Sequence, residues 1–344
     1  MHTRSVSTAQ SPAHGRPWLQ RSALFASGRD ALVGLLRWGV GRHGWRRVWL
    51  PSYNCPEVPA ALLAAVRDSV ELRAYPDALM DAAADLAAIP TAPGDVVLVV
   101  NQLGARPAPD IGPARARGVI VVEDHSHDPG SAWAEASGAD YAFASLRKTL
   151  PIPDGGAVWS PRGLDLPPEP AGGHERARLA DALGARRRRL RPDDRLVFRA
   201  LARAASGSPE PVPGVAISPV SRALLPDMPV GAWRERRRRN LDILADGVAP
   251  ATGVRVLCAP NGGVAFALTL VFDDAEARAA VRSALISRAV VPLVLWPLHP
   301  TRHWGVGPAD AELSRRVLSI QGDQRFDADD MHRLAAVLRD VLGG

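Results

Sequence analysis

The sequence predicts an α/β fold, with a large domain on a mostly parallel central sheet and a smaller C-terminal α+β domain. Short apolar runs alternate with helical patterns between residues 20 and 160, which is typical of βαβ units. Two of these runs, DVVLVVN and GVIVVED, are apolar throughout, as in parallel strands that are covered on both faces. A length of 344 residues agrees with about two domains.

The elements of the first half follow in chain order. Helical patterns cover 31–38 and 59–66, and short apolar runs cover 48–51, 70–75, 95–101, 118–124, 141–146 and 156–160. We expect a flexible tail at 1–20, the large domain at 21–230 and the small domain at 231–344. Within the large domain, an arginine-rich helical segment is expected at 172–205.

The small domain is expected to begin with a long helix from Trp233. It continues with the runs VRVL and VAFALTLVF, a helix at 274–289, the run VVPLVLW, a helical ELSRRVL, the run LSIQGDQ and a last helix near Asp327. Asp327 is a suitable N-cap, with Asp330 three positions later in the first turn.

The composition excludes several classes of protein. Hydrophobic residues make up 47% of the chain and charged residues 23%, which rules out wholesale disorder. No apolar run approaches the roughly 20 residues of a membrane span, and the first residues lack the apolar stretch of a secretory signal. Cys55 and Cys258 are too few for a disulfide framework. We therefore expect a cytoplasmic protein without a membrane partner.

The net charge of +6 favours small anionic molecules over duplex DNA. Arginine runs at 186–189 and 236–239 either bind an anion or a nucleic acid, or form solvated helix faces or a contact across a dimer. No aromatic interleaving, zinc-ligand spacing or helix-turn-helix signature accompanies them. We therefore favour the second interpretation and expect no nucleic-acid partner.

Lys148 is the only lysine among 42 basic side chains. Arginine can replace lysine wherever only a positive charge is needed, but a guanidinium cannot replace a primary amine that attacks a carbonyl. Either Lys148 carries covalent amine chemistry, or it is a lysine that has survived by chance.

Polar side chains follow the apolar runs and are expected to meet at one edge of the sheet. Asn101 ends one run, Asp124 ends the next, and the turn 145–148 follows a third. Ligands of open α/β sheets bind beyond the carboxyl ends of the strands. An acid at the end of a strand, a serine and a lysine about two dozen residues later and then Gly-Gly suit pyridoxal phosphate (PLP), which has a ring nitrogen, a phosphate and an aldehyde.

Five segments, in order, carry a resemblance to the DegT/DnrJ-type sugar aminotransferases, which are PLP-dependent enzymes of fold type I. They are SGRDAL at 27–32, PSYNC at 51–55, VVNQLGARPAPDI at 99–111, EDHSHD at 123–128 and SLRKTLPIPDGG at 145–156. The C-terminal LSIQGDQRFDADDMHRLAAVL also resembles the closing strand and helix of the family. The ordered set includes the only lysine of the chain.

The resemblance implies a role for each matched position. Gly28 and Arg29 occupy the place that receives the cofactor phosphate, and Arg29 either reaches the phosphate itself or binds an acidic substrate. Cys55, or Tyr53 from two residues earlier, occupies the place of an aromatic side chain over the ring. Asn101 lies in a segment that resembles the one in which, in the family, a histidine or similar residue precedes Gly-x-Pro-x-Asp, and it is expected to bind the cofactor. Asp124 would pair with the ring nitrogen and His127 would touch the ring hydroxyl.

Lys148 would hold the cofactor as a Schiff base, and Ser145 would offer its hydroxyl to the phosphate. Lys148 must be neutral to form an imine, and once released it is the natural base for moving the α-proton. Asp124, when ionised, keeps the ring protonated and electron-withdrawing. Asp124 as a helix cap and Ser145 as a turn residue remain the alternatives. The pattern His125-x-His127 with Asp128 is too sparse for zinc, so no metal is expected.

The resemblance implies an aminotransferase that moves an amino group from an amino-acid donor, glutamate or glutamine, to a keto sugar or other small carbonyl acceptor. It also implies a homodimer. Two alternatives remain: a PLP-dependent lyase or dehydratase on the same fold, and a non-catalytic binding or regulatory protein that has kept the fold.

Overall fold

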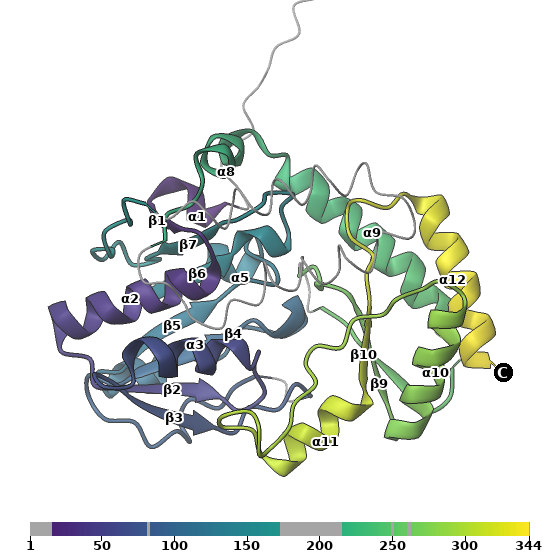
Figure 1. Ribbon diagram of the computed structural model, residues 1–344, viewed down its shortest axis with the longest axis horizontal. Helices are drawn as coiled ribbons and strands as arrows, with labels where there is room; N and C mark the ends of the chain where they lie inside the picture. Colours follow the sequence, from purple (N-terminus) through teal and green to yellow (C-terminus); the bar gives the residue numbers. More distant parts are fainter. Residues whose placement is uncertain (1–15, 81–82, 173–214, 249–250, 260–262, 344) are drawn as a thin grey trace, which may run out of the picture.

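The computed structural model describes residues 16–80, 83–172, 215–248, 251–259 and 263–343. Figure 1 shows two sheets side by side, the larger formed by the first half of the chain. The larger sheet has seven strands in the order β1-β7-β6-β5-β4-β2-β3. The strands are β1 (Ser22–Phe25), β2 (Arg47–Pro51), β3 (Glu71–Tyr75), β4 (Val96–Val100), β5 (Ile120–Asp124), β6 (Tyr141–Ser145) and β7 (Gly156–Trp159).

Strands β3, β2, β4, β5 and β6 pair in parallel, whereas β7 pairs antiparallel with both of its neighbours. All five residues of β4 are buried. Even and odd positions of this strand contribute to two different cores. One core holds α2 (Gly28–His43) and α3 (Glu57–Val66) against the sheet, and the other face is covered by α1 (Pro17–Gln20), α4 (Gly112–Ala116) and α5 (Ala132–Glu135). The continuously apolar strands are therefore covered on both faces, as predicted.

Helix α2 is the element that later positions the site. Its N-cap is Ser27, whose side chain accepts a hydrogen bond from the backbone N–H of Asp30 at 3.2 Å. Ala31, Leu35 and other apolar side chains at helical spacing bury its inner face. The helix ends at His43 and is capped by Gly44, whose φ of 69° places it in the left-handed region.

The second half of the chain forms a three-stranded antiparallel sheet in the order β10-β9-β8. Its strands are β8 (Val254–Leu257), β9 (Leu268–Phe272) and β10 (Val317–Ile320), and its helices are α9 (Val230–Val248), α10 (Ala275–Ser287), α11 (Pro308–Arg316) and α12 (Ala328–Gly343). The three strands with α9, α10 and α12 enclose a separate core. The first half also contains short 3-10 turns at Gln102–Gly104 and Leu146–Lys148. Helix α8 (Pro219–Leu224) and a third 3-10 turn at Leu225–Asp227 precede α9 and complete the described elements.

The predicted fold class is confirmed, with local differences. The run VVPLVLW forms no strand, because Pro292 and Pro297 have no N–H to donate, and only an isolated bridge joins Leu293 to Ser319. The helical pattern ELSRRVL ends at Arg316, and β10 begins with the next residue. Asp327 caps the last helix as expected, since its carboxylate accepts from the N–H of Asp330 at 2.9 Å.

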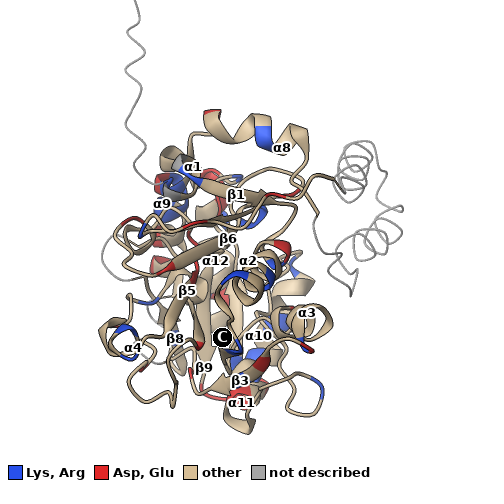
Figure 2. Ribbon diagram, turned by 90° about the vertical axis from the view of Figure 1, so that its left-hand side faces the viewer, with Lys and Arg blue, Asp and Glu red and all other residues tan. Residues whose placement is uncertain are grey.

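The structure modifies two expectations, one about the flexible tail at 1–20 and one about the arginine runs. Trp18 lies in a short helix and is fully buried, so the chain is packed before residue 20. The run 236–239 lies on α9, which Figure 2 shows in blue, and three of its arginines are exposed while Arg237 is buried. The run 186–189 and most of the expected helical segment 172–205 lie outside the described residues. Among the described residues, no helix is both long and apolar enough to span a membrane.

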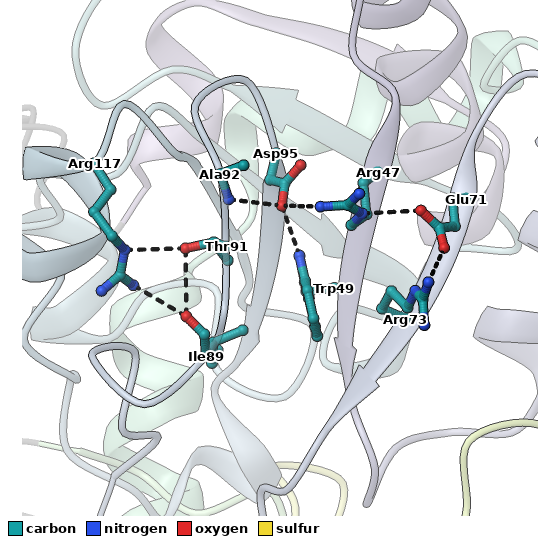
Figure 3. Close-up of polar contacts among 9 residues, drawn as sticks. All are labelled: Arg47, Trp49, Glu71, Arg73, Ile89, Thr91, Ala92, Asp95 and Arg117. Carbon is teal, nitrogen blue, oxygen red and sulfur yellow. Dashed lines mark hydrogen bonds and ion pairs between the residues drawn. The ribbon is translucent and has the colours of Figure 1, made fainter.

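The amino ends of the parallel strands carry a network of paired charges, drawn in Figure 3. The Asp95 carboxylate, just before β4, accepts from the indole N–H of Trp49 at 2.9 Å, from Arg47 at 3.2 Å and from the N–H of Ala92 at 3.0 Å. Arg47 also donates to Glu71 at 2.9 Å. The charges of Arg47, Glu71 and Asp95 therefore have partners within the protein.

Candidate active site

A pocket opens at the opposite edge of the sheet, beyond the carboxyl ends of β4, β5 and β6. The N-terminal end of α2 forms one side of the pocket, and Trp296 reaches it from the second half of the chain. The lining residues are Ser27, Gly28, Arg29, Leu32, Asn54, Cys55, Glu57, Val58, Val100, Asp124, Ser126, His127, Phe143, Ser145, Arg147, Lys148 and Trp296. The sequence motifs at 27–32, 51–55, 123–128 and 145–156 therefore meet at one place.

The start of α2 is pressed against the end of β6. A Cβ on Gly28 would lie 2.8 Å from the Cβ of Ser145, and a Cβ on Gly156 would lie 2.1 Å from the carbonyl oxygen of Ser27. Only glycine fits at these two positions without a shift of the backbone. The close approach brings the first backbone N–H groups of the helix and the positive end of the helix dipole to the pocket, where an anion is favoured.

Asp124 is the last residue of β5 and is 7% exposed. Its Oδ1 atom accepts a hydrogen bond from the backbone N–H of Ser126 at 2.8 Å, which fixes the orientation of the carboxylate. The hydroxyl of Ser126 accepts in turn from the backbone N–H of Ser145 at 2.8 Å. A short chain of hydrogen bonds therefore joins the carboxylate of β5 to the end of β6.

Lys148 lies in the 3-10 turn that follows β6, and its Nζ is 3.3 Å from Nε2 of His127. The other ring nitrogen of His127 accepts from the backbone N–H of Leu103 at 3.1 Å. Burial, and then the positive charge of Lys148, hold the pKa of His127 well below its usual value. The only lysine of the chain therefore faces an uncharged imidazole in the pocket.

Two guanidinium groups add positive charge. Arg29 is 3.1 Å from the carboxylate of Glu57, and Arg147 lines the same pocket. Loss of hydration, and then the charge of Arg29, lower the pKa of the Arg147 guanidinium. With Lys148, the pocket carries three cationic side chains against the two carboxylates of Asp124 and Glu57. This balance favours an anionic ligand.

Cys55 lies in the pocket wall at the place where an aromatic side chain was considered. Burial raises the pKa of its thiol, against the opposing effect of the positive charge of Lys148. An aromatic wall is instead supplied by Trp296, whose ring centroid is 5.8 Å from that of His127 with 35° between the planes. Trp296 follows β9 by more than twenty residues, so its place depends on the packing of the two halves of the chain.

Two of the expected cofactor-binding residues do not line the pocket. Tyr53 is fully buried, and its hydroxyl donates to the carbonyl oxygen of Leu295 at 3.0 Å. Asn101 is also buried, just beyond β4, and its backbone N–H donates to the carbonyl oxygen of Asp124 at 2.9 Å. Tyr53 packs away from the pocket because Leu79, Leu103 and Leu298 surround its ring.

The other seven expected residues all line the pocket: Gly28, Arg29, Cys55, Asp124, His127, Ser145 and Lys148. Their roles stay predictions. Sequence reasoning missed Asn54, Ser126 and Trp296. Asn54 lies within the PSYNC motif and Ser126 between two expected residues, so their neighbours could have indicated them. Trp296 has no such signal.

The His-x-His pattern does not converge. His125 is fully buried, and its Nε2 is 2.8 Å from Glu123, whereas His127 lines the pocket. The described residues contain no group of three or more side chains that could hold a metal ion.

Solved structures share this fold. S. venezuelae DesV in complex with a ketimine intermediate has a TM-score of 0.64 and 20% identity, over 95% of this chain and 87% of DesV. The aminotransferase TlmJ from Streptoalloteichus hindustanus has a TM-score of 0.61 and 18% identity, over 96% of this chain and 89% of TlmJ. DesI in the presence of its TDP-sugar product has a TM-score of 0.59 and 21% identity, over 95% and 82% of the two chains.

No protein-family model matches the sequence, and no curated protein matches it. The fold is nevertheless the one that the five sequence motifs imply, because a DegT DnrJ EryC1 StrS aminotransferase from Brucella abortus shares it, with a TM-score of 0.52 and 15% identity over 94% of this chain and 87% of that chain. At these identities the similarity is one of fold.

Proposed function

We propose that this chain is a PLP-dependent aminotransferase that moves an amino group from an amino acid, glutamate or glutamine, to a keto sugar or another small carbonyl compound. The observation that carries the proposal is the position of Lys148. The only lysine of the chain lies in a pocket with a fixed carboxylate at the end of β5 and the N-terminal end of α2.

The residues of the pocket fit PLP. The start of α2, where a Cβ on Gly28 would collide with Ser145, forms a cradle for the phosphate group. Asp124 offers a carboxylate of fixed orientation for the ring nitrogen. A protein of the same fold, the putative sugar aminotransferase Spr1654 from Streptococcus pneumoniae, is known in a PLP form and a PMP form. When bound, PLP supplies an aldehyde that condenses with amines and a ring that withdraws electrons from the adjacent carbon.

The chain's own residues then have separate tasks. Lys148 would hold the cofactor at its aldehyde and, when the donor amine has taken its place, would carry a proton at Nζ to and from the substrate carbon. His127, which stays uncharged beside it, would bind the ring hydroxyl. Arg29 and Arg147 bind the phosphate of the cofactor or the carboxylate of the substrate. Trp296 shields the pocket from water.

A half-reaction tests the proposed activity. We expect glutamate or glutamine alone to convert the bound aldehyde form to the amine form and to release one keto acid per site. A keto acceptor should then restore the original absorption spectrum, as in ping-pong chemistry. Release of ammonia or of a dehydrated product without the amine form would indicate a lyase instead. PLP binding without any half-reaction across the common amino acids would indicate a regulatory protein.

We also propose a homodimer in the cytoplasm that binds neither a membrane nor a nucleic acid. Val220 and Leu224 are exposed one helical turn apart on α8, which favours an apolar contact there. Both cysteines are free in the structure, which suits a reducing compartment. Sedimentation at micromolar concentration tests the dimer, and a monomer with full activity would contradict it. Cell fractionation tests the location.

A further inference from the structure

Helix α9 is connected to the wall of the pocket through Asp128, the neighbour of His127. Both Nε and Nη2 of Arg234 donate to the two carboxylate oxygens of Asp128, each at 2.8 Å. Asp128 is 1% exposed and follows His127 directly in the chain. A bidentate ion pair of this kind fixes orientation as well as distance. A side chain of α9 therefore holds the residue next to His127.

A second connection from α9 passes through Gln324, in the loop after β10. Nη2 of the buried Arg237 donates to the amide oxygen of Gln324 at 3.0 Å. The amide nitrogen of Gln324 donates to the backbone carbonyl oxygen of Thr149 at 2.8 Å. Thr149 follows Lys148 directly in the chain.

The loop that carries Gln324 is itself held in place. Nδ2 of Asn240, one turn further along α9, donates to the carbonyl oxygens of Asp323 and Phe326 at 3.0 and 3.1 Å. A Cβ on Gly322 would lie 3.0 Å from the side chain of Leu241, so this loop packs closely on the same helix. Gln324 is therefore presented to Thr149 by a rigid support, not by a free loop.

The two connections end on the residues that follow His127 and Lys148, whose side chains are 3.3 Å apart. We propose that Arg234 and Gln324 are positioning residues, which together hold the His127 loop and the Lys148 turn so that the lysine amine stays beside the imidazole. Only the benefit of this arrangement for catalysis rests on the proposed function. The contacts themselves belong to the protein without cofactor.

The test uses the fact that Lys148 is the only lysine. In the apoprotein, an amine-selective reagent modifies Lys148 and the α-amino group, and peptide mass mapping separates the two. Gln324→Met removes both hydrogen bonds of Gln324 without a change of charge and with little change of size. Gln321→Met is the matched control, because Gln321 lies in the same loop and makes no side-chain hydrogen bond among the described residues.

We expect the rate of Lys148 modification under native conditions to rise at least about three-fold in Gln324→Met, because the turn can move and the amine leaves the imidazole. Gln321→Met should keep the parent rate. Arg234→Gln, which frees the other loop, should also raise the rate. A merely structural role would lower the melting temperature and leave the native rate unchanged, and that result would overturn the proposal.

A second readout separates this inference from the proposed function. If the apoprotein binds PLP, the dissociation constant of PLP should rise at least about three-fold in Gln324→Met and stay at the parent value in Gln321→Met. If no PLP binds to the parent, the proposed function fails, while the modification rates still decide whether Gln324 positions Lys148. Equal modification rates in all the variants would contradict the inference whether or not PLP binds.

Discussion

Asp95 and Asp124 lie at opposite edges of one sheet and are almost equally buried, at 5% and 7% exposed. Asp95 precedes β4 at the amino edge, and one of its oxygens accepts three hydrogen bonds (Figure 3). Asp124 ends β5 at the carboxyl edge, and it lines the pocket with one oxygen held by Ser126. Two similar carboxylates thus have different surroundings.

The charged groups at the two edges of the sheet have different roles, one in stability and the other in function. At the amino edge, Arg47, Glu71 and Asp95 satisfy one another. At the carboxyl edge, Arg147, Lys148 and Asp124 face a pocket. Buried polar groups cost free energy unless they are paired, so pairing at the first edge stabilises the fold. Charged groups that face a pocket indicate binding or catalysis. A substitution at the amino edge should therefore lower the stability and leave the activity unchanged. A substitution at the carboxyl edge should lower the activity and leave the stability nearly unchanged.

The largest effect is expected for Lys148→Arg. Turnover should fall at least about 10⁴-fold, because a guanidinium cannot form the imine at working pH. Stability should change by less than about 0.5 kcal/mol, since the side chain is exposed in the pocket and the charge is kept. Steady-state kinetics and thermal unfolding measure both. Substantial turnover in this variant would remove Lys148 from the reaction.

Asp124→Asn should lower turnover at least about a hundred-fold with little loss of stability. The amide keeps the shape of the side chain and can still accept from Ser126, but it has no charge to stabilise a protonated ring nitrogen. Kinetics of the PLP-loaded variant measure the effect. Equal rates for the variant and the parent would place Asp124 outside the site.

Asp95→Asn is the matched substitution at the other edge. It should lower the free energy of unfolding by about 1–2 kcal/mol, because hydrogen bonds to a neutral amide are weaker than those to a carboxylate and Arg47 loses a partner. The rate per folded molecule should match the parent. Denaturant unfolding and active-site titration test this pair of outcomes. A large loss of the rate per folded molecule would contradict the distinction between the two edges.

The smallest expected effect is a pH dependence of stability from His127. Its pKa in the folded protein lies well below the usual value, because of burial and then of the charge of Lys148. The unfolded chain takes up a proton below about pH 6.5 and the folded one does not, so stability falls as the pH falls, by up to about 1.4 kcal/mol per unit. In His127→Gln this slope should decrease between pH 6.5 and 5. An unchanged slope would contradict it.

The sequence predicted the carboxyl edge well where a local pattern was enough. The continuously apolar β4 and β5 placed Asp124 at a strand end, and the only lysine stood out by composition. Tyr53 was expected at the pocket, but its apolar neighbours come from both halves of the chain and could not be read locally.

The same limit applies to the second half of the chain. Trp296 reaches the pocket from a proline-interrupted run that has no periodicity. Arg237 lies in a run of four arginines that reads as a solvated face, yet it is buried and bound to Gln324. Such positions depend on the packing of elements that are far apart in the sequence. A local hydrophobic pattern carries no information about that packing.

The most direct test of the central claim is reduction of the PLP-loaded protein with borohydride, followed by peptide mass mapping. We predict one pyridoxyl group per chain, on the peptide that contains Lys148, and a loss of the absorption band of the bound aldehyde. Lys148→Arg should take up no label. A parent protein that remains colourless with PLP, or that is labelled only at its α-amino group, would contradict the account.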